Sequence, residues 1–329
     1  FPIVYWLVCG DLGHNGSHFA MSRRFPIINT ISFYLNCFHM QFHLWTVQHV
    51  MGHHTYTNIN NLDPDCHHFQ QANSPVCGYR VCTDQPVLPK YGRWWKFAMS
   101  FQAWATSAAI SLLNVPKYLN ERSLECAKVP ERWAQAIKYD RLFVLALLGA
   151  YGYKFGFTLG FARLWIAGGI HGCMFNVFSQ ISHVQENCFG RPELYKKKKN
   201  LEKIEWAAHQ LLSGADYACD SKLWCLFSIN LNSQICHHLF PSIHPCHYPE
   251  IRRLLIPVAK KHGLDYEGRS SETFWGAFRN YFNWLWKLNH VEGEHISMFL
   301  HVFYQSLIVF SPVLLHQIYG ESYWGELRA

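Results

Sequence analysis

The sequence predicts an all-α integral membrane protein, in which transmembrane helices form hairpins and a cytoplasmic helical cap holds a histidine-rich site. Three observations support this prediction. Long apolar runs alternate with polar stretches, and half of the residues are hydrophobic. Charged residues make up only 16% of the 329 residues, against about 25% in a typical soluble domain. The chain also contains 21 histidines, and many of them gather in the polar stretches.

Residues 141–183 carry the strongest membrane signal, because this run of more than forty residues is mostly apolar. One membrane span needs about twenty residues, so we expect two spans that turn near Thr158 to Arg163. Four lysines follow at 196–199, and such a block beside an apolar run is typical of the cytoplasmic flank of a span. A partner nucleic acid is therefore not expected, despite the net charge of +7.

The remaining segments are assigned from composition. Residues 25–44 contain seven polar groups, so we expect them to lie in the membrane interface or to enter and return on one side. Residues 66–93 predict a loop, 94–115 an interfacial helix, 120–140 an amphipathic helix, and 296–319 a further membrane segment. The sequence does not begin with methionine and starts inside an apolar stretch, so we expect an N-terminal truncation.

Three histidine clusters stand outside the predicted spans. Residues three or four apart share one face of a helix, and the spacing within each cluster therefore points several imidazoles the same way. In the second cluster the first two histidines share a face, and the third turns away toward a second metal. The clusters are HNGSH (His14, His18), HVMGHH (His49, His53, His54) and QICHH (Gln234, His237, His238).

These clusters are expected to meet on one side of the membrane. Residues 25–44 separate the first two clusters without crossing, and the two spans of 141–183 return the chain to the face where it started. His183, at the end of the second span, joins the same side. Eight imidazoles exceed the need of one metal, since a catalytic zinc takes three protein ligands and a water. The count favours two metals, and imidazole suits zinc, copper, iron and nickel alike.

In these three motifs and their order, the chain resembles the membrane fatty-acid desaturases, specifically the front-end acyl-lipid branch, whose third box begins with Gln. The surrounding QISHVQE (180–186) and EWAA (205–208) are also similar to the family, and the resemblance covers roughly residues 10 to 265. We therefore divide the chain into a desaturase domain, 1–265, and a C-terminal extension, 266–329. The stretch QHVMGHHTYTN is most similar to Δ5-type enzymes, with Δ4, Δ6 and Δ8 left open.

The resemblance implies a centre of two non-haem iron ions, O₂ as co-substrate, and no catalytic residues beyond the metal ligands. It implies formation of a cis double bond in an acyl lipid or acyl-CoA, with electrons from cytochrome b5 and its reductase. It also implies residence in the endoplasmic reticulum membrane, with the histidine boxes facing the cytoplasm. The implied ligands are His14, His18, His49, His53, His54, His183, His237 and His238, with Gln234 as a ligand or near-ligand.

Two departures from the family pattern stand out. The first box usually begins His-Asp, whereas position 15 is Asn, and Asp11, one helical turn before His14, is the candidate replacement. No His-Pro-Gly-Gly motif of a fused cytochrome b5 domain occurs, so that domain either preceded Phe1 or is a separate protein. The weaker candidates for contact with the metal ligands or the substrate are Asp11, Asn15, His171, Glu205 and Trp206.

Other functions remain open at this point. A sphingolipid long-chain-base desaturase and an acyl hydroxylase would use a similar scaffold. A haem-binding electron-transfer membrane protein would need histidines paired across facing spans, whereas these histidines cluster outside the spans. A non-enzymatic receptor would show degraded boxes, and only Asn15 departs from the pattern.

Overall fold

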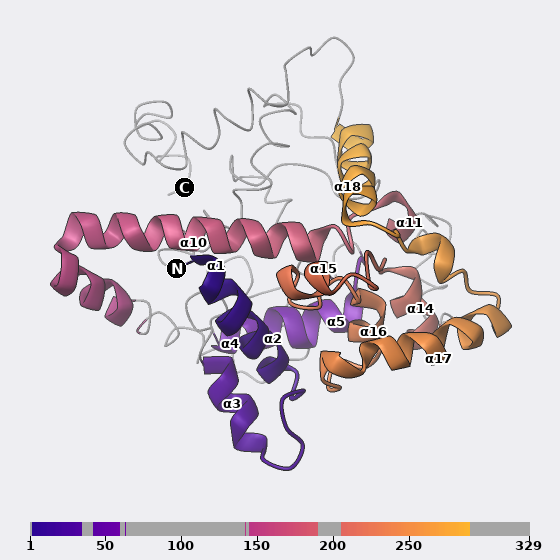
Figure 1. Cartoon of the computed structure of the whole chain (residues 1–329), viewed down its shortest axis with the longest axis horizontal. Helices are drawn as coiled ribbons and strands as arrows, with labels where there is room; N and C mark the ends of the chain where they lie inside the picture. Colours follow the sequence, from indigo (N-terminus) through magenta and orange to yellow (C-terminus); the bar gives the residue numbers. More distant parts are fainter. Residues whose placement is uncertain are drawn as a thin grey trace, which may run out of the picture.

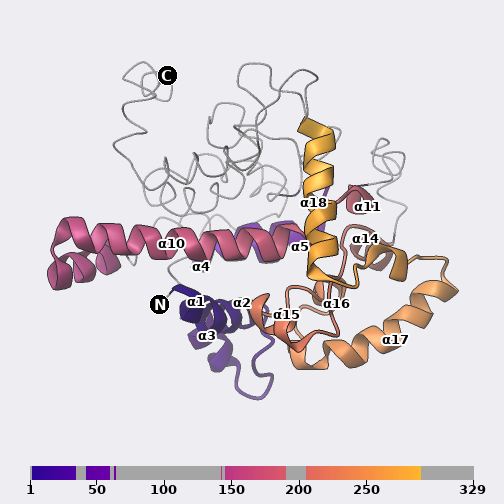
Figure 2. The same cartoon turned by 45° about the horizontal axis from the view of Figure 1, so that its top comes forward.

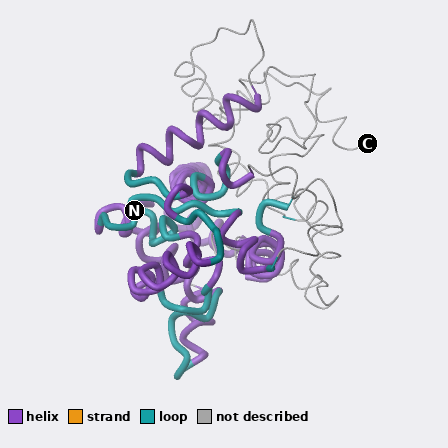
Figure 3. Tube along the Cα trace, turned by 90° about the vertical axis from the view of Figure 1, so that its right-hand side faces the viewer, coloured by secondary structure: helices purple, strands orange, loops and turns teal. Residues whose placement is uncertain are grey.

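The computed structural model describes residues 2–34, 42–59, 63, 142, 145–189 and 205–289. These residues form helices joined by turns and loops (Figure 3). The only β-pairing among them is an isolated bridge between Tyr217 and Ser271. The predicted all-α architecture is confirmed for this part of the chain.

The N-terminal part consists of short helical pieces that lie beside one another (Figure 1). Its first group is α1 (Pro2–Tyr5), the π-helix η1 (Trp6–Gly10), α2 (Asp11–Ser17) and α3 (Pro26–Tyr34). The second group is α4 (Phe42–Trp45), the π-helix η2 (Thr46–His53) and α5 (His54–Tyr56). Gly16 lets α2 and α3 approach closely, because a Cβ there would lie 2.6 Å from the Asn29 carbonyl oxygen.

Helix α3 buries the polar side chains of Asn29 and Ser32 together with Phe33, and its isoleucines are exposed. Asn29 is 1% exposed, and its side-chain oxygen accepts a hydrogen bond from the Met21 backbone at 2.9 Å. Ile27 and Ile31, on the outer face, are 63% and 57% exposed. This arrangement is the reverse of a helix on the surface of a water-soluble core. Within the predicted interfacial segment 25–44, residues 35–41 lie outside the described residues.

A helical hairpin occupies the region of the two predicted spans. Residues 145–155 are helical, Gly156 interrupts the helix with a φ of +79°, and α10 (Phe157–Gln180) follows. The turn predicted at 158–163 was therefore wrong by a few residues. The chain reverses at Gly156, because a glycine has no Cβ and adopts a positive φ without strain. Among the described helices, none combines the length and apolar character that a membrane crossing requires.

The C-terminal half gathers beside the end of α10, and α18 stands across α10 in both views (Figures 1 and 2). Its helices are α11 (Glu186–Phe189), α14 (Trp206–Leu212), α15 (Lys222–Phe227), α16 (Gln234–Leu239), the 3₁₀-helix η3 (Pro245–His247), α17 (Tyr248–Lys261), the 3₁₀-helix η4 (Glu267–Arg269) and α18 (Phe274–Asn289). The predicted segments 66–93, 94–115, 120–140 and 296–319 lie outside the described residues.

One hydrophobic core joins the two halves. Trp6 from η1 is fully buried, and its indole nitrogen donates to the Phe227 carbonyl at 2.7 Å. Tyr217 is also fully buried and donates its hydroxyl to the Phe178 carbonyl, near the end of α10, at 3.2 Å. Residues 266–289, assigned above to the extension, contribute Phe274, Tyr281 and Trp284 to this core. The core therefore fixes the end of α10 against both halves.

Candidate metal centre

All eight histidines singled out in the sequence lie in one buried cluster. They come from α2 and the residue that caps its C-terminus, from η2 and α5, from the turn after α10, and from α16. Each is at most 7% exposed, and their rings pack edge-on or stacked against one another, as with His54 and His238 at 4.2 Å between centroids. Segments as far apart in sequence as residues 14 and 238 thus share one site.

The histidines divide into two sets by the distances between their ring nitrogens. Within each set, one nitrogen from every residue lies within 4.8 Å of the others. His54 lies between the sets, because its Nε2 is 3.2 Å from His49 Nε2 while its ring stacks on His238. The first set is His14, His18, His49 and His237, and the second set is His53, His183 and His238.

The π-helical turn η2 decides which histidine of the second cluster joins which set. A π-helix closes its hydrogen bonds over five residues, and the His54 backbone N–H indeed donates to the His49 carbonyl. His49 and His54 therefore share a face and contact each other, whereas His53 faces the second set. The rings of His49 and His53 still stack with centroids 5.4 Å apart, as α-helical spacing predicts, but the ring nitrogens of His53 group with the second set.

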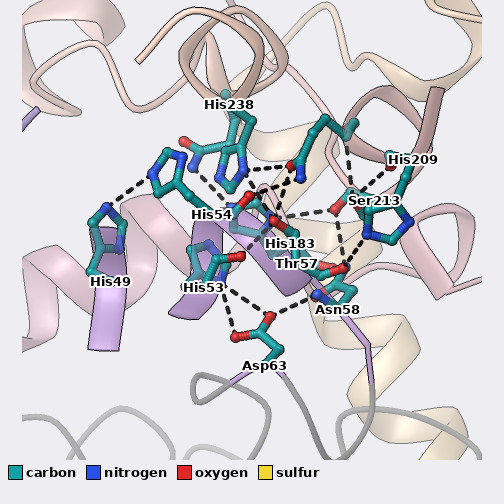
Figure 4. Close-up of polar contacts among 12 residues, drawn as sticks. His49, His53, His54, Thr57, Asn58, Asp63, His183, His209, Ser213 and His238 are labelled. Carbon is teal, nitrogen blue, oxygen red and sulfur yellow. Dashed lines mark hydrogen bonds and ion pairs between the residues drawn. The ribbon is translucent and has the colours of Figure 1, made fainter. Parts of the chain in front are cut away.

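In each histidine of the second set, Nδ1 lies within hydrogen-bonding distance of a buried oxygen (Figure 4). His53 Nδ1 is 3.1 Å from both carboxylate oxygens of Asp63. His183 Nδ1 is 3.2 Å from the Ser213 carbonyl oxygen, and His238 Nδ1 is 2.9 Å from Gln210 Oε1. Histidines that bind a metal through one nitrogen commonly donate the other ring N–H to such acceptors. The Nε2 atoms are thereby left with lone pairs.

Several ring nitrogens inside the cluster are buried and have no hydrogen-bond partner, as expected of metal ligands. His14, His237 and His238 each have a buried Nε2 with no hydrogen-bond partner. His18 Nε2 and His49 Nε2 face each other at 3.1 Å. Buried polar atoms are nearly always satisfied in proteins, so this convergence of imidazole nitrogens fits two transition-metal ions.

Gln234 lies at the edge of the second set. Its Nε2 is 2.9 Å from His183 Nε2. Its side-chain oxygen is buried and has no hydrogen-bond partner. The amide is therefore within reach of the position at which a second-set metal would lie.

Burial keeps these histidines neutral. It lowers the pKa of His14 from 6.5 to about 4 and that of His183 to about 3. For His18, His49 and His54, burial and then repulsion by neighbouring histidines lower the pKa well below 6.5, and the same holds for His237 and His238. A histidine must be neutral to bind a metal, so these seven histidines are already in the required state at neutral pH.

Helix α16, which carries the third cluster, is held at its N-terminus by a carboxylate from outside the helix. Asp216 Oδ1 accepts from the Ile235 backbone N–H at 2.8 Å, and Asp216 Oδ2 accepts from the Tyr266 hydroxyl. Asp216 is only 1% exposed, and burial raises its pKa from 3.8 to about 6. The bond satisfies a backbone donor that a helix leaves free in its first turn.

The weaker sequence candidates are placed as follows. In α2, Asn15 is buried and donates its side-chain amide to Asp11 Oδ1 at 3.0 Å. Asp11 therefore meets Asn15, while the carboxylate that meets a clustered histidine is Asp63. Glu205 and Trp206 are exposed at the start of α14. His171 lies in α10, and its side chain falls outside the described part.

Several residues that support the histidines were not identified from the sequence. The sequence motifs assign no role to Thr57, Asp63, Gln210 or Ser213. Trp45 also received no role, yet it is 4% exposed and stacks on His49 with 4.0 Å between the ring centroids. The one available signal was position, because 57–63 directly follow the second cluster and 209–213 precede the third.

Comparison with known proteins gives one family. The model of the fatty acid desaturase family matches residues 1–270. An acyl-lipid (8-3)-desaturase of Physcomitrium patens is 30% identical over 86% of this chain and 58% of its own length. Acyl-lipid omega-13 desaturase of Chlamydomonas reinhardtii is 25% identical over 88% of this chain and 60% of its own length.

Delta(5) fatty acid desaturase A of Dictyostelium discoideum is 26% identical over 75% of this chain and 52% of its own length. The chain thus spans between about half and three fifths of the length of these curated relatives. No solved structure matches it.

Proposed function

The chain belongs to the fatty acid desaturase family, and from that premise we propose that it is a front-end acyl-chain desaturase. It removes one hydrogen from each of two adjacent carbons of a polyunsaturated or unsaturated acyl chain, and a cis double bond forms between them. O₂ accepts these two hydrogens together with two electrons and two protons, and two waters leave. The electrons come from cytochrome b5 with its reductase, whether fused in a longer protein or separate.

The observation that carries this proposal is the pair of buried histidine sets. Two iron ions, held by the eight histidines with Gln234 as a ligand or near-ligand, supply O₂ activation and the oxidising power for breaking unactivated C–H bonds. The residues of the chain hold the Nε2 lone pairs inward, keep the imidazoles neutral, and exclude water. The buried oxygens on the Nδ1 atoms of the second set fix the tautomer there.

The packing of the rings disfavours a haem protein. Two axial histidines must lie on opposite sides of a flat macrocycle, whereas these rings stack or meet edge to face with centroids as close as 4.2 Å. Four nitrogens of the first set and three of the second lie within 4.8 Å of one another inside their sets. Such spacing suits single metal ions.

A membrane location in the endoplasmic reticulum, with the histidine sets toward the cytoplasm, belongs to the same proposal. It is supported by the apolar side chains that face outward on the N-terminal helices and at the hairpin. Val4 is 63% exposed, Ile31 57% and Phe157 75%. Large exposed apolar surfaces mark contact with a protein or a membrane, and an apolar acyl substrate is delivered from a membrane.

The names of the relatives support a lipid-linked acyl chain as substrate. Two of them are named acyl-lipid desaturases, and one is named a Delta(5) desaturase. We propose the Δ5 position accordingly. The chemistry of the site is the same for Δ4, Δ6 and Δ8, so the position of the double bond has to be determined by analysing the product.

Expression in yeast tests this function directly. Cells that express the chain, with and without a fused cytochrome b5 domain, receive unsaturated fatty acids with existing double bonds at defined positions. Gas chromatography–mass spectrometry then locates any new double bond. We expect one on the carboxyl side of an existing double bond, and its loss in the His237→Ala variant.

The same assay separates the rival reactions. A hydroxylated fatty acid would replace the proposal by an acyl hydroxylase, and a desaturated long-chain base without a fatty-acid product would replace it by a sphingolipid desaturase. A purified chain that binds no iron under anaerobic loading would overturn the di-iron centre itself.

A further inference from the structure

The two histidine sets differ in how their tautomers are fixed. In the second set, two of the three Nδ1 atoms face oxygens that can only accept, the Asp63 carboxylate and the Ser213 carbonyl. The third, on His238, lies 2.9 Å from the Gln210 side-chain oxygen and 3.1 Å from the Thr57 hydroxyl. The Nδ1 atoms of His53 and His183 must therefore carry the proton. Their Nε2 atoms keep the lone pair, which in His183 faces the Gln234 amide nitrogen at 2.9 Å.

The first set lacks this arrangement within the described residues. The one oxygen that meets a first-set Nδ1 there is the Tyr248 hydroxyl, 3.3 Å from His237. A hydroxyl both donates and accepts, so it does not fix the tautomer. His18 Nε2 and His49 Nε2 face each other at 3.1 Å, and this contact does not fix the tautomer of either ring.

Asp63 adds a carboxylate to the second set. The other oxygens that meet second-set Nδ1 atoms belong to uncharged groups, whereas Asp63 is a carboxylate. Its side chain is 0% exposed. The Asn58 backbone N–H donates to its Oδ2 at 2.6 Å, which holds the carboxylate against His53. The Asn58 side chain also donates to the His183 and Ser213 carbonyls, at 2.9 and 3.0 Å. The loop that orients Asp63 therefore also supports His183.

We propose that Asp63 is a positioning residue that makes the second-set site bind its metal more tightly than the first-set site. A buried cation among neutral imidazoles gains from a nearby carboxylate, because the interior screens charge poorly. A carboxylate on the far nitrogen of a histidine also makes that ligand more basic. Loss of such a partner typically weakens metal binding about 10- to 100-fold. The inference rests on the metal centre of the proposed function.

Metal titration of the purified chain in detergent tests this assignment. The metal-free protein is loaded anaerobically with ⁵⁷Fe(II), challenged with a graded chelator, and followed by iron content and Mössbauer spectra. We expect two irons of unequal affinity and two spectral components. His183→Ala identifies the second-set component by removing it, and His49→Ala identifies the other.

Asp63→Asn then weakens the second-set iron about 10- to 100-fold and leaves the first-set iron within about twofold. Asp63→Glu, which restores the charge, recovers part of the loss. The matched control is Asp220→Asn, which removes a carboxylate that pairs with Arg252 at 3.1 Å and is 91% exposed. It should change neither iron.

The outcomes separate this inference from the proposed function. If the unaltered chain binds no iron, the proposed function fails. If it binds two irons and Asp63→Asn leaves both affinities unchanged, only the role of Asp63 is refuted. Parallel loss of both irons in Asp63→Asn also refutes it, because the carboxylate would then maintain the fold rather than one site. Retained first-set iron serves as the internal measure of folding.

Discussion

Gly16 lies between His14 and His18 in α2, and the change Gly16→Ala tests how closely the position of this helix is fixed. The added Cβ would lie 2.6 Å from the Asn29 carbonyl oxygen and 2.7 Å from the Phe33 backbone nitrogen. Both neighbours are backbone atoms of α3, so they cannot rotate away, and the two helices must move apart by several tenths of an ångström.

The expected cost follows from two opposing terms. Overpacking of this kind costs about 1–3 kcal/mol, and alanine is about 1 kcal/mol better than glycine inside a helix. The net result is a loss of about 1 kcal/mol in the free energy of unfolding. Metal sites tolerate ligand shifts of only about 0.5 Å, so the iron of the first set should be lost more readily than that of the second.

The assay is thermal unfolding of the purified chain in detergent, together with iron content. The matched control is Gly149→Ala, in the helical segment 145–155, because its added Cβ meets nothing within 4 Å. The control should raise the midpoint of unfolding slightly, and Gly16→Ala should lower it. If Gly16→Ala instead behaves like Gly149→Ala and keeps both irons, the close contact between α2 and α3 does not position the first set.

Two further predictions concern the second set and pH. Gln210→Ala removes the oxygen that meets His238 Nδ1 at 2.9 Å and leaves buried donors unsatisfied, at a cost of about 1–3 kcal/mol. Second-set iron should therefore be lost at lower chelator concentration, whereas Gln210→Glu should retain more of it. Equal retention in both variants and the unaltered chain would contradict this. For the metal-free chain, the folded-state pKa of His14 is lowered from 6.5 to about 4, so between these pH values the unfolded chain binds more protons. The free energy of unfolding should fall by about 1.4 kcal/mol per pH unit for each such histidine as the pH drops below 6.5, and stay level above it. Asp216, whose pKa is raised to about 6, acts in the opposite direction, but the lowered histidines outnumber it. Denaturant unfolding from pH 8 to pH 5 measures this, and a stability that rises toward pH 5 would contradict it.

The composition of the site could be predicted from the sequence, because adjacent imidazoles at helical spacing have few uses other than metal binding. The helical class followed from apolar runs of helix length. The detailed assignment within the second cluster could not be predicted, since α-helical spacing pairs His49 with His53. The π-helical turn that pairs His49 with His54 depends on one backbone hydrogen bond over five residues, and local sequence does not encode it visibly.

The supporting residues were less predictable still. Asp63 reaches His53 across ten residues, and Gln210 meets Thr57 across 153 residues. Neither separation follows a helical period, so only the folded chain reveals these contacts. Gly156 was missed as the hairpin turn for a different reason: in an apolar run with several glycines, only the backbone angle shows which one takes the left-handed conformation.

In the proposed function, both histidine sets serve one desaturation reaction. The most direct test is the product formed in yeast by His49→Ala, from the first set, and His53→Ala, from the second, with expression levels matched. His262→Ala is the control, because His262 is exposed at the C-terminal end of α17 and belongs to neither set. We expect no new double bond from either set variant and full product from the control. Substantial product from His49→Ala or from His53→Ala would contradict the claim that the reaction needs both sets.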